Sequence, residues 1–97
     1  MKVFINKIIP DMGLNLLQEA GLEVTVWREE RVLTREEAIE QCLLHDAFLN
    51  VGQTGVDADF FQQCNHLKVM ALHSVGFDNV DVAAATRYKI PVADRNF

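Results

Sequence analysis

Clustered cations are missing from this sequence. Its nine lysines and arginines are scattered along the chain and outnumbered by 14 aspartates and glutamates, which leaves a formal net charge of −5. Phosphate-rich partners need clustered positive charge, so this balance argues against nucleic acid and against an anionic membrane surface. Apolar runs of membrane-spanning length are also missing, and the first apolar run ends at Asn6 after three residues. We therefore expect no signal peptide, no membrane span and a cytoplasmic protein.

Cysteine is scarce as well. Cys42 and Cys64 are the two cysteines and form no CxxC pair. Both fall on apolar faces of predicted helices, which predicts buried, reduced thiols rather than a disulfide. A zinc site from Cys64, His66 and His73 would have a spacing that matches no standard set, so no metal is expected. The sequence also lacks GxGxxG and the P-loop pattern, so no nucleotide cofactor is expected to bind this chain.

What the sequence does contain is a regular alternation of strand-like and helical segments. Strands are predicted at residues 3–5, 23–27, 47–49, 68–72 and 90–93, and helices at 11–20, 34–43, 57–64 and 81–88. Four of the five strands are nearly continuous apolar runs, which is typical of parallel strands buried on both faces. The pattern predicts one α/β domain over residues 1–97. Its sheet would have five parallel strands in the order 2-1-3-4-5 with helices on both faces, a flavodoxin-like architecture.

Local motifs predict where these helices begin and end. Thr34 and Glu37 form a capping box, in which each side chain satisfies a backbone N–H of the other residue. Asp57 and Asp81 are predicted N-caps, and Gly21 suits the left-handed position that follows a helix. In the first helix, Met12, Leu16, Leu17 and Ala20 are predicted to share one apolar face.

Ligands of open α/β sheets bind beyond the carboxyl ends of the strands, which here means loops 6–10, 50–56 and 73–79. Loop 50–56 is polar and glycine-rich, and is either a flexible connection or a ligand contact. In loop 73–79 a buried strand leads through Gly76 to a helix start, so the loop is either a plain turn or a set of backbone N–H groups that holds an anion. His73 is a candidate ligand contact or general acid, although no carboxylate at a fixed spacing supports it. We assign no catalytic residue.

Residues 67–92, "LKVMALHSVGFDNVDVAAATRYKIPV", closely resemble the NAD-dependent D-isomer-specific 2-hydroxyacid dehydrogenases. In that family a strand leads to a Val-Gly or Ala-Gly turn, an aromatic residue, Asp-Asn, a branched residue and an aspartate that opens a helix. Residues 49–69, "LNVGQTGVDADFFQQCNHLKV", look like the family's preceding segment. The likeness is specific in residues 67–92 and loose before Ala47.

The resemblance implies a substrate-binding domain of a two-domain enzyme. The backbone N–H groups of Val75 and Gly76 would hold the substrate carboxylate, while Val51 and Gly52 would line the same cleft. The family's second domain, which binds NAD(H) or NADP(H) and supplies the catalytic residues, has no counterpart in these 97 residues. We therefore expect a fragment that is inactive by itself and binds a small 2-oxo or 2-hydroxy acid weakly. The full-length parent would be of the glyoxylate, hydroxypyruvate or D-lactate type.

Two departures from the family pattern bear on this interpretation. Family members usually have glycine where Lys89 stands, so a left-handed Lys89 would be strained. The chain also stops after Asp94-Arg95-Asn96-Phe97 without the family's Asn-x-Pro-like turn.

Two other functions are compatible with an α/β domain of this kind. A signalling receiver would need acidic residues where Asn6, Lys7 and Asn50 stand, and is disfavoured. A stand-alone binding or assembly module of the same ancestry stays open. We also expect a homodimer through an uncovered sheet face, with Tyr88 and Phe97 as anchors.

Overall fold

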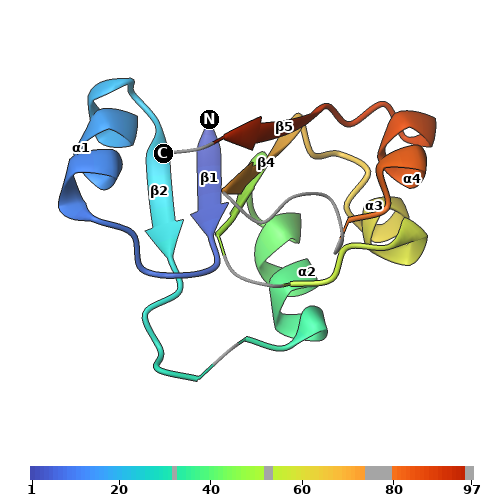
Figure 1. Ribbon diagram of the computed structural model, residues 1–97, viewed down its shortest axis with the longest axis horizontal. Helices are drawn as coiled ribbons and strands as arrows, with labels where there is room; N and C mark the ends of the chain where they lie inside the picture. The colour runs from blue at the N-terminus through green and yellow to red at the C-terminus, as the bar shows by residue number, and fades with distance from the viewer. Residues whose placement is uncertain (32, 52–53, 74–79, 96–97) are drawn as a thin grey trace.

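The computed structural model describes residues 1–31, 33–51, 54–73 and 80–95, in which strands and helices alternate (Figure 1). The strands are β1 (Lys2–Ile5), β2 (Glu23–Val26), β3 (Ala47–Asn50), β4 (Val69–His73) and β5 (Val92–Arg95). The helices are α1 (Asp11–Glu19), α2 (Arg35–Leu43), α3 (Ala58–Gln63) and α4 (Val82–Arg87). Within the described residues, none of these helices has the length and apolar character needed to span a membrane.

The strands form one parallel sheet, so the predicted parallel α/β class is confirmed. The strand order is β2-β1-β3-β4-β5. Each neighbouring pair is parallel, with Phe4 beside Phe48 and Phe48 beside Met70 in the middle of the sheet. Because every strand runs the same way, the loops that follow β1, β3 and β4 leave from one edge of the sheet. This edge is where ligands of such sheets bind.

Helices cover both faces of the sheet, as Figure 1 shows. On one face α2, α3 and α4 pack over the larger core, whose fully buried side chains include Phe4, Phe48, Phe60 and Met70. On the other face Leu17 of α1 packs against a smaller core built from Val3, Ile5, Ala47 and Leu49. The two cores together explain why the central strands β1 and β3 are apolar on both sides.

Helix α1 leaves much of its apolar face uncovered. Met12, Leu16, Leu17 and Ala20 were predicted to share one apolar face, and no residue of α1 is buried. Leu17 contacts the smaller core, whereas the side chains of Met12 and Leu16 are 77% and 62% exposed. Apolar periodicity identifies residues that share a helix face, but it cannot show whether another element covers that face.

The fifth strand also begins later than predicted, at Val92 instead of Ile90. Ile90 is buried and donates its backbone N–H to the carbonyl of Ala85 at 2.9 Å, while Lys89 donates to Thr86 at 3.1 Å. These two bonds form a Schellman motif that ends α4. Ile90 therefore belongs to the helix end, and the strand follows Pro91.

The predicted helix ends are confirmed. Thr34 accepts a hydrogen bond from the Glu37 N–H at 3.2 Å, and the Glu37 carboxylate accepts one from the Thr34 N–H at 2.9 Å. Asp57 caps α3 and Asp81 caps α4 through bonds of 2.9 and 3.0 Å. Gly21 has φ of 84°, the left-handed conformation that its place after α1 predicted.

Lys89 has φ of 60° and is the only described non-glycine residue with a positive φ. Its Cβ makes this conformation unfavourable, so we expect Lys89→Gly to raise the free energy of unfolding by up to about 1 kcal/mol. Urea unfolding followed by circular dichroism measures the change. Lys89→Ala is the matched control, because it removes the charged side chain but keeps the Cβ. An equal gain from alanine would show that backbone strain is not the reason.

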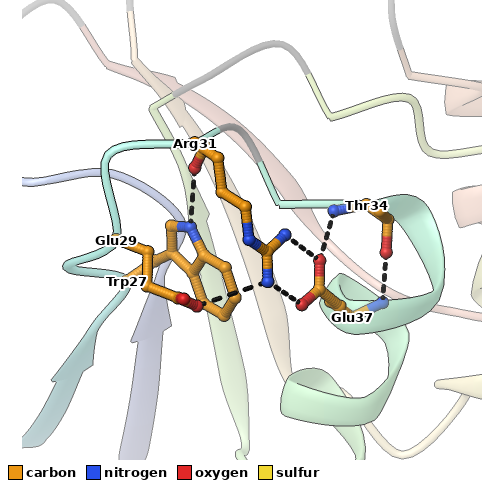
Figure 2. Close-up of polar contacts among 5 residues, drawn as sticks. All are labelled: Trp27, Glu29, Arg31, Thr34 and Glu37. Atoms are coloured by element: carbon orange, nitrogen blue, oxygen red, sulfur yellow. Dashed lines mark hydrogen bonds and ion pairs between the residues drawn. The ribbon is translucent and has the colours of Figure 1, made fainter.

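The connection between β2 and α2 is held by Arg31 (Figure 2). Its guanidinium donates two hydrogen bonds to the Glu37 carboxylate, approaches Glu29 at 3.4 Å, and lies 5.1 Å from the centre of the Trp27 ring. The Trp27 indole N–H donates to the Arg31 carbonyl at 3.1 Å. Arg31 is exposed. Its charge is matched by Glu37, which makes it a structural cation rather than a free anion-binding group.

The hydrogen bonds from Arg31 and from the Thr34 backbone lower the pKa of Glu37 to about 2. A carboxylate whose pKa falls on folding stabilises the native state above its unfolded pKa, and this stabilisation is lost as the pH falls through the folded value. We therefore expect the stability difference between the native sequence and Glu37→Gln to be full at pH 7 and to vanish between about pH 4.5 and pH 2. Glu36→Gln, in the same helical turn, is the control. A stability difference that does not depend on pH would contradict the expectation.

Candidate functional site

Two loops at the carboxyl edge of the sheet begin and end side by side. The loop that starts after β3 and the loop that starts after β4 leave from neighbouring strands, where Asn50 is in register with Leu72. At their far ends Val56 and Val80 form an isolated parallel bridge, and the Asp81 N–H donates to the Val56 carbonyl at 2.8 Å. Both valines are buried. The two segments that the sequence singled out are therefore joined at both ends.

The first of these loops is also fixed where α3 begins. Asp57 accepts hydrogen bonds from the Phe60 N–H at 2.9 Å and from Arg35 at 2.8 Å. Arg35 reaches Asp59 as well, at 2.9 Å, so it ties the start of α2 to the start of α3. The hydrogen bond from Arg35 is the main reason why the pKa of Asp57 lies below its usual value. The helix that follows the loop is thus anchored by an N-cap and by ion pairs.

Of the five predicted substrate-binding residues, Val51 and His73 lie in the described part of the chain. Gly52, Val75 and Gly76 lie outside the described residues. The backbone of His73 is the last position of β4, in register with Arg95, and its side chain lies outside the described part. Val51 is half-buried against the smaller core.

A buried polar cluster at this edge was not predicted from the sequence. Asn6 follows β1, Asn50 ends β3 and Thr54 lies in the loop after it, and all three are buried. The Asn6 amide group donates to Asn50 Oδ1 at 2.8 Å and to Thr54 Oγ1 at 2.9 Å, while its carbonyl oxygen accepts from the Val51 N–H at 2.8 Å. Asn50 in turn donates to the Thr54 carbonyl at 3.1 Å. The cluster therefore shapes the start of the loop from inside.

The sequence did hold a sign of this cluster. Asn6 and Asn50 each stand at the carboxyl end of an apolar strand, and the predicted strand order makes those strands neighbours. Buried amides in adjacent positions are expected to pair, because an unpaired buried polar group costs free energy. In the sequence, Asn6 and Asn50 stood out only as positions where a signalling receiver would need acidic residues.

The cysteines lie in the core, away from this edge. Cys42 and Cys64 are both fully buried free thiols, as predicted. The hydrogen bond to Cys64, together with burial, raises the pKa of the Cys42 thiol, and the same contact lowers the pKa of Cys64. The Nε2 atom of His66 lies 2.9 Å from the carbonyl oxygens of both Cys42 and His45, so the ring hydrogen-bonds to the backbone at the end of α2. Among the described residues, no three His, Cys, Asp or Glu side chains are grouped to hold a metal ion.

Known proteins resemble this chain in sequence and in fold. Glyoxylate reductases of Pyrococcus furiosus and Thermococcus gammatolerans are each 40% identical over 93 residues, which is 96% of this chain but 27% and 28% of the relatives' lengths. The solved structure of the TT0316 protein from Thermus thermophilus superposes with a TM-score of 0.83 at 32% identity, over 95% of this chain and 29% of that one. The chain thus spans little more than a quarter of these relatives.

One family model agrees with both comparisons and with the resemblance in residues 67–92. It describes the catalytic domain of the D-isomer specific 2-hydroxyacid dehydrogenases and matches residues 3–95. Since the match extends from β1 to β5 and takes in all four helices, this chain belongs to the D-isomer-specific 2-hydroxyacid dehydrogenase family.

Proposed function

We propose that this chain is the substrate-binding domain of a D-2-hydroxyacid dehydrogenase that reduces a small 2-oxo acid of the glyoxylate, hydroxypyruvate or pyruvate kind. The observation that supports this most is the pair of loops that leave β3 and β4 at one edge of the sheet and meet again at Val56 and Val80. The relatives named glyoxylate reductase support the substrate class. Because the chain spans about a quarter of their length, hydride transfer belongs to a longer protein.

In this proposal the backbone N–H groups of Val75 and Gly76 hold the substrate carboxylate. Val51, Gly52 and His73 line the same cleft. Backbone donors near the start of a helix favour an anion, and a glycine without a Cβ lets the anion approach the chain closely. The whole dehydrogenase would share the anion with a cation from outside this chain. We therefore expect these residues alone to bind no more tightly than about 1 mM, or about −4 kcal/mol.

The nicotinamide cofactor, NAD(H) or NADP(H), has no fitting residues here. The five glycines stand at positions 13, 21, 52, 55 and 76, so none of them forms the GxGxxG loop that cradles a dinucleotide pyrophosphate. The proposal therefore assigns the cofactor and the catalytic groups to the rest of the longer dehydrogenase. This chain alone should neither reduce glyoxylate nor take up NADH. Saturable micromolar binding of NADH in calorimetry would overturn this assignment.

Titration with glyoxylate, followed by amide shifts in NMR spectra, tests the carboxylate site. We expect shifts confined to residues 50–56 and 73–79, and none with glyoxylamide, which has no carboxylate. Gly76→Val should abolish them, because its side chain would occupy the path of the anion. Gly13→Ala on α1 is the control, because its Cβ would lie 3.6 Å from the Ile9 side chain, an ordinary contact. Shifts outside these two loops, or shifts that survive Gly76→Val, would contradict the proposal.

We also propose that the chain self-associates, with a revised surface. Tyr88 is half-buried against the larger core, so it is a poor anchor, and Phe97 lies outside the described residues. Met12 and Leu16 instead lie one turn apart on α1 and are 77% and 62% exposed, and Ile8, before the helix, is 58% exposed; these three residues form an exposed apolar stripe along the sequence. A twofold contact would pair this stripe with its copy. Sedimentation velocity tests this: the native chain should dimerise at tens of micromolar, and Met12→Lys should stay monomeric. A native chain that stays monomeric at that concentration would contradict the proposal.

A further inference from the structure

The cluster of Asn6, Asn50 and Thr54 is centred on Asn6. The carboxamide of Asn6 provides one oxygen acceptor and two N–H donors, and the structure shows bonds to Val51, Asn50 and Thr54 from these atoms. The partners are 44 to 48 residues away along the chain. The Asn6 side chain, directly after β1, therefore binds Asn50, Val51 and Thr54 at the end of β3 and in the loop that follows it.

Because these side chains are buried, the loss of one of their hydrogen bonds is costly in free energy. Asn6, Asn50 and Thr54 are 5%, 2% and 7% exposed, so water cannot readily replace a partner that is lost. A buried polar group left without its partner costs more than the bond itself contributes. Asn50, Val51 and Thr54 are thus held by hydrogen bonds to buried groups. An apolar residue at position 6 would fill the space but would leave the Val51 N–H without its acceptor.

The location of this cluster connects it to the proposed substrate site. It lies at the carboxyl edge of the sheet, where Asn6 accepts a hydrogen bond from the N–H of Val51, one of the proposed substrate contacts. The far end of loop 50–56 is bridged to Val80, which follows the other proposed substrate loop. The loop is therefore fixed from the inside at its start and from the side at its end.

We propose that Asn6 is a positioning residue for the substrate, which acts by fixing Asn50, Val51 and Thr54 at the carboxyl edge of the sheet. It touches the loop and not the substrate. This inference rests on the proposed function, since it assigns a purpose to the shape of the loop. Thr54 is the second member of the device, because its hydroxyl accepts from Asn6 and its carbonyl accepts from Asn50.

Amide hydrogen exchange and glyoxylate titration on the same variants test the inference. In Asn6→Ala, exchange of the Val51 amide should accelerate about tenfold, and the dissociation constant for glyoxylate should rise by a similar factor. Asn65→Ala is the matched control, because Asn65 is exposed and donates to the nearby Gln62 carbonyl at 3.1 Å. Neither quantity should change in this control.

Should Asn6→Ala fold poorly, Thr54→Val and Thr54→Ser provide a milder pair. Valine keeps the volume of threonine without the hydroxyl, whereas serine keeps the hydroxyl. We expect valine to weaken glyoxylate binding and serine to leave it near the native value. Exchange of the Phe48 amide in the sheet core separates positioning from general destabilisation, since it should stay unchanged while that of Val51 accelerates.

Each outcome decides one of the two claims. An unchanged Val51 amide in Asn6→Ala overturns the positioning role, as does faster exchange with an unchanged glyoxylate constant. A native chain that shows no glyoxylate shifts removes the proposed function. The exchange measurement then still establishes or refutes that Asn6 fixes the loop.

Discussion

Replacing Phe60 with alanine is expected to lower the free energy of unfolding by about 3–5 kcal/mol. Phe60 is fully buried in the first turn of α3. The centroid of its ring lies 6.0 Å from that of the stacked Phe48 ring and 6.5 Å from that of the edge-on Phe61 ring. The loss combines the burial of a large apolar side chain with the cavity that alanine leaves. For a domain whose whole stability is about 5–15 kcal/mol, such a loss leaves little folded protein at elevated temperature.

Urea unfolding of Phe60→Ala beside Leu44→Ala measures the effect. Leu44 is 68% exposed, so its truncation should change stability by less than about 0.5 kcal/mol. Phe60 also matters for the site, because α3 starts immediately after loop 50–56 and its N-cap residue Asp57 bonds to the Phe60 N–H. A loss no larger than that of the Leu44 variant would mean that α3 is not held by this ring.

The second large effect concerns the thiols. Cys42 and Cys64 are fully buried, so a thiol-specific aromatic disulfide reagent should react with the native chain at least about a thousandfold more slowly than with the urea-unfolded chain. Reaction with the native chain requires local opening, and the raised pKa of Cys42 lowers its thiolate fraction further. Two thiols per chain should be counted after unfolding without reductant.

The single variants Cys42→Ala and Cys64→Ala assign the reaction to each sulfur. Rapid labelling of the native chain would contradict the burial of the pair. A count of no thiols after unfolding would mean that the cysteines are joined as a disulfide, against the prediction made from their apolar helix positions.

Features that depend on neighbours along the chain were well predicted. The capping box of Thr34 and Glu37, the N-caps Asp57 and Asp81, and the left-handed Gly21 all depend on backbone groups within a few residues. Such short-range bonds form in the same way wherever the helix packs. The predicted start of β5 was wrong by two residues, since the end of α4 extends to Ile90 through a motif that requires a left-handed Lys89.

The sequence predicted the edge of the sheet where the candidate site lies, but not which side chains meet there. The predicted parallel sheet places loops 50–56 and 73–79 at one edge, and the likeness in residues 67–92 indicated the family. The Asn6 cluster was missed because its partners are separated by more than 40 residues. Their contact exists only once β1 and β3 lie side by side.

The sequence by itself determined the alternation of strands and helices, their caps and the family to which the chain belongs, because these follow from apolar periodicity and from short motifs. Tertiary structure alone decided which polar side chains meet at the carboxyl ends of β1 and β3 and which apolar side chains of α1 stay exposed. Both depend on which surfaces the folded sheet brings together. Distances between residues far apart in the chain are fixed by packing and not by any pattern that a single segment carries.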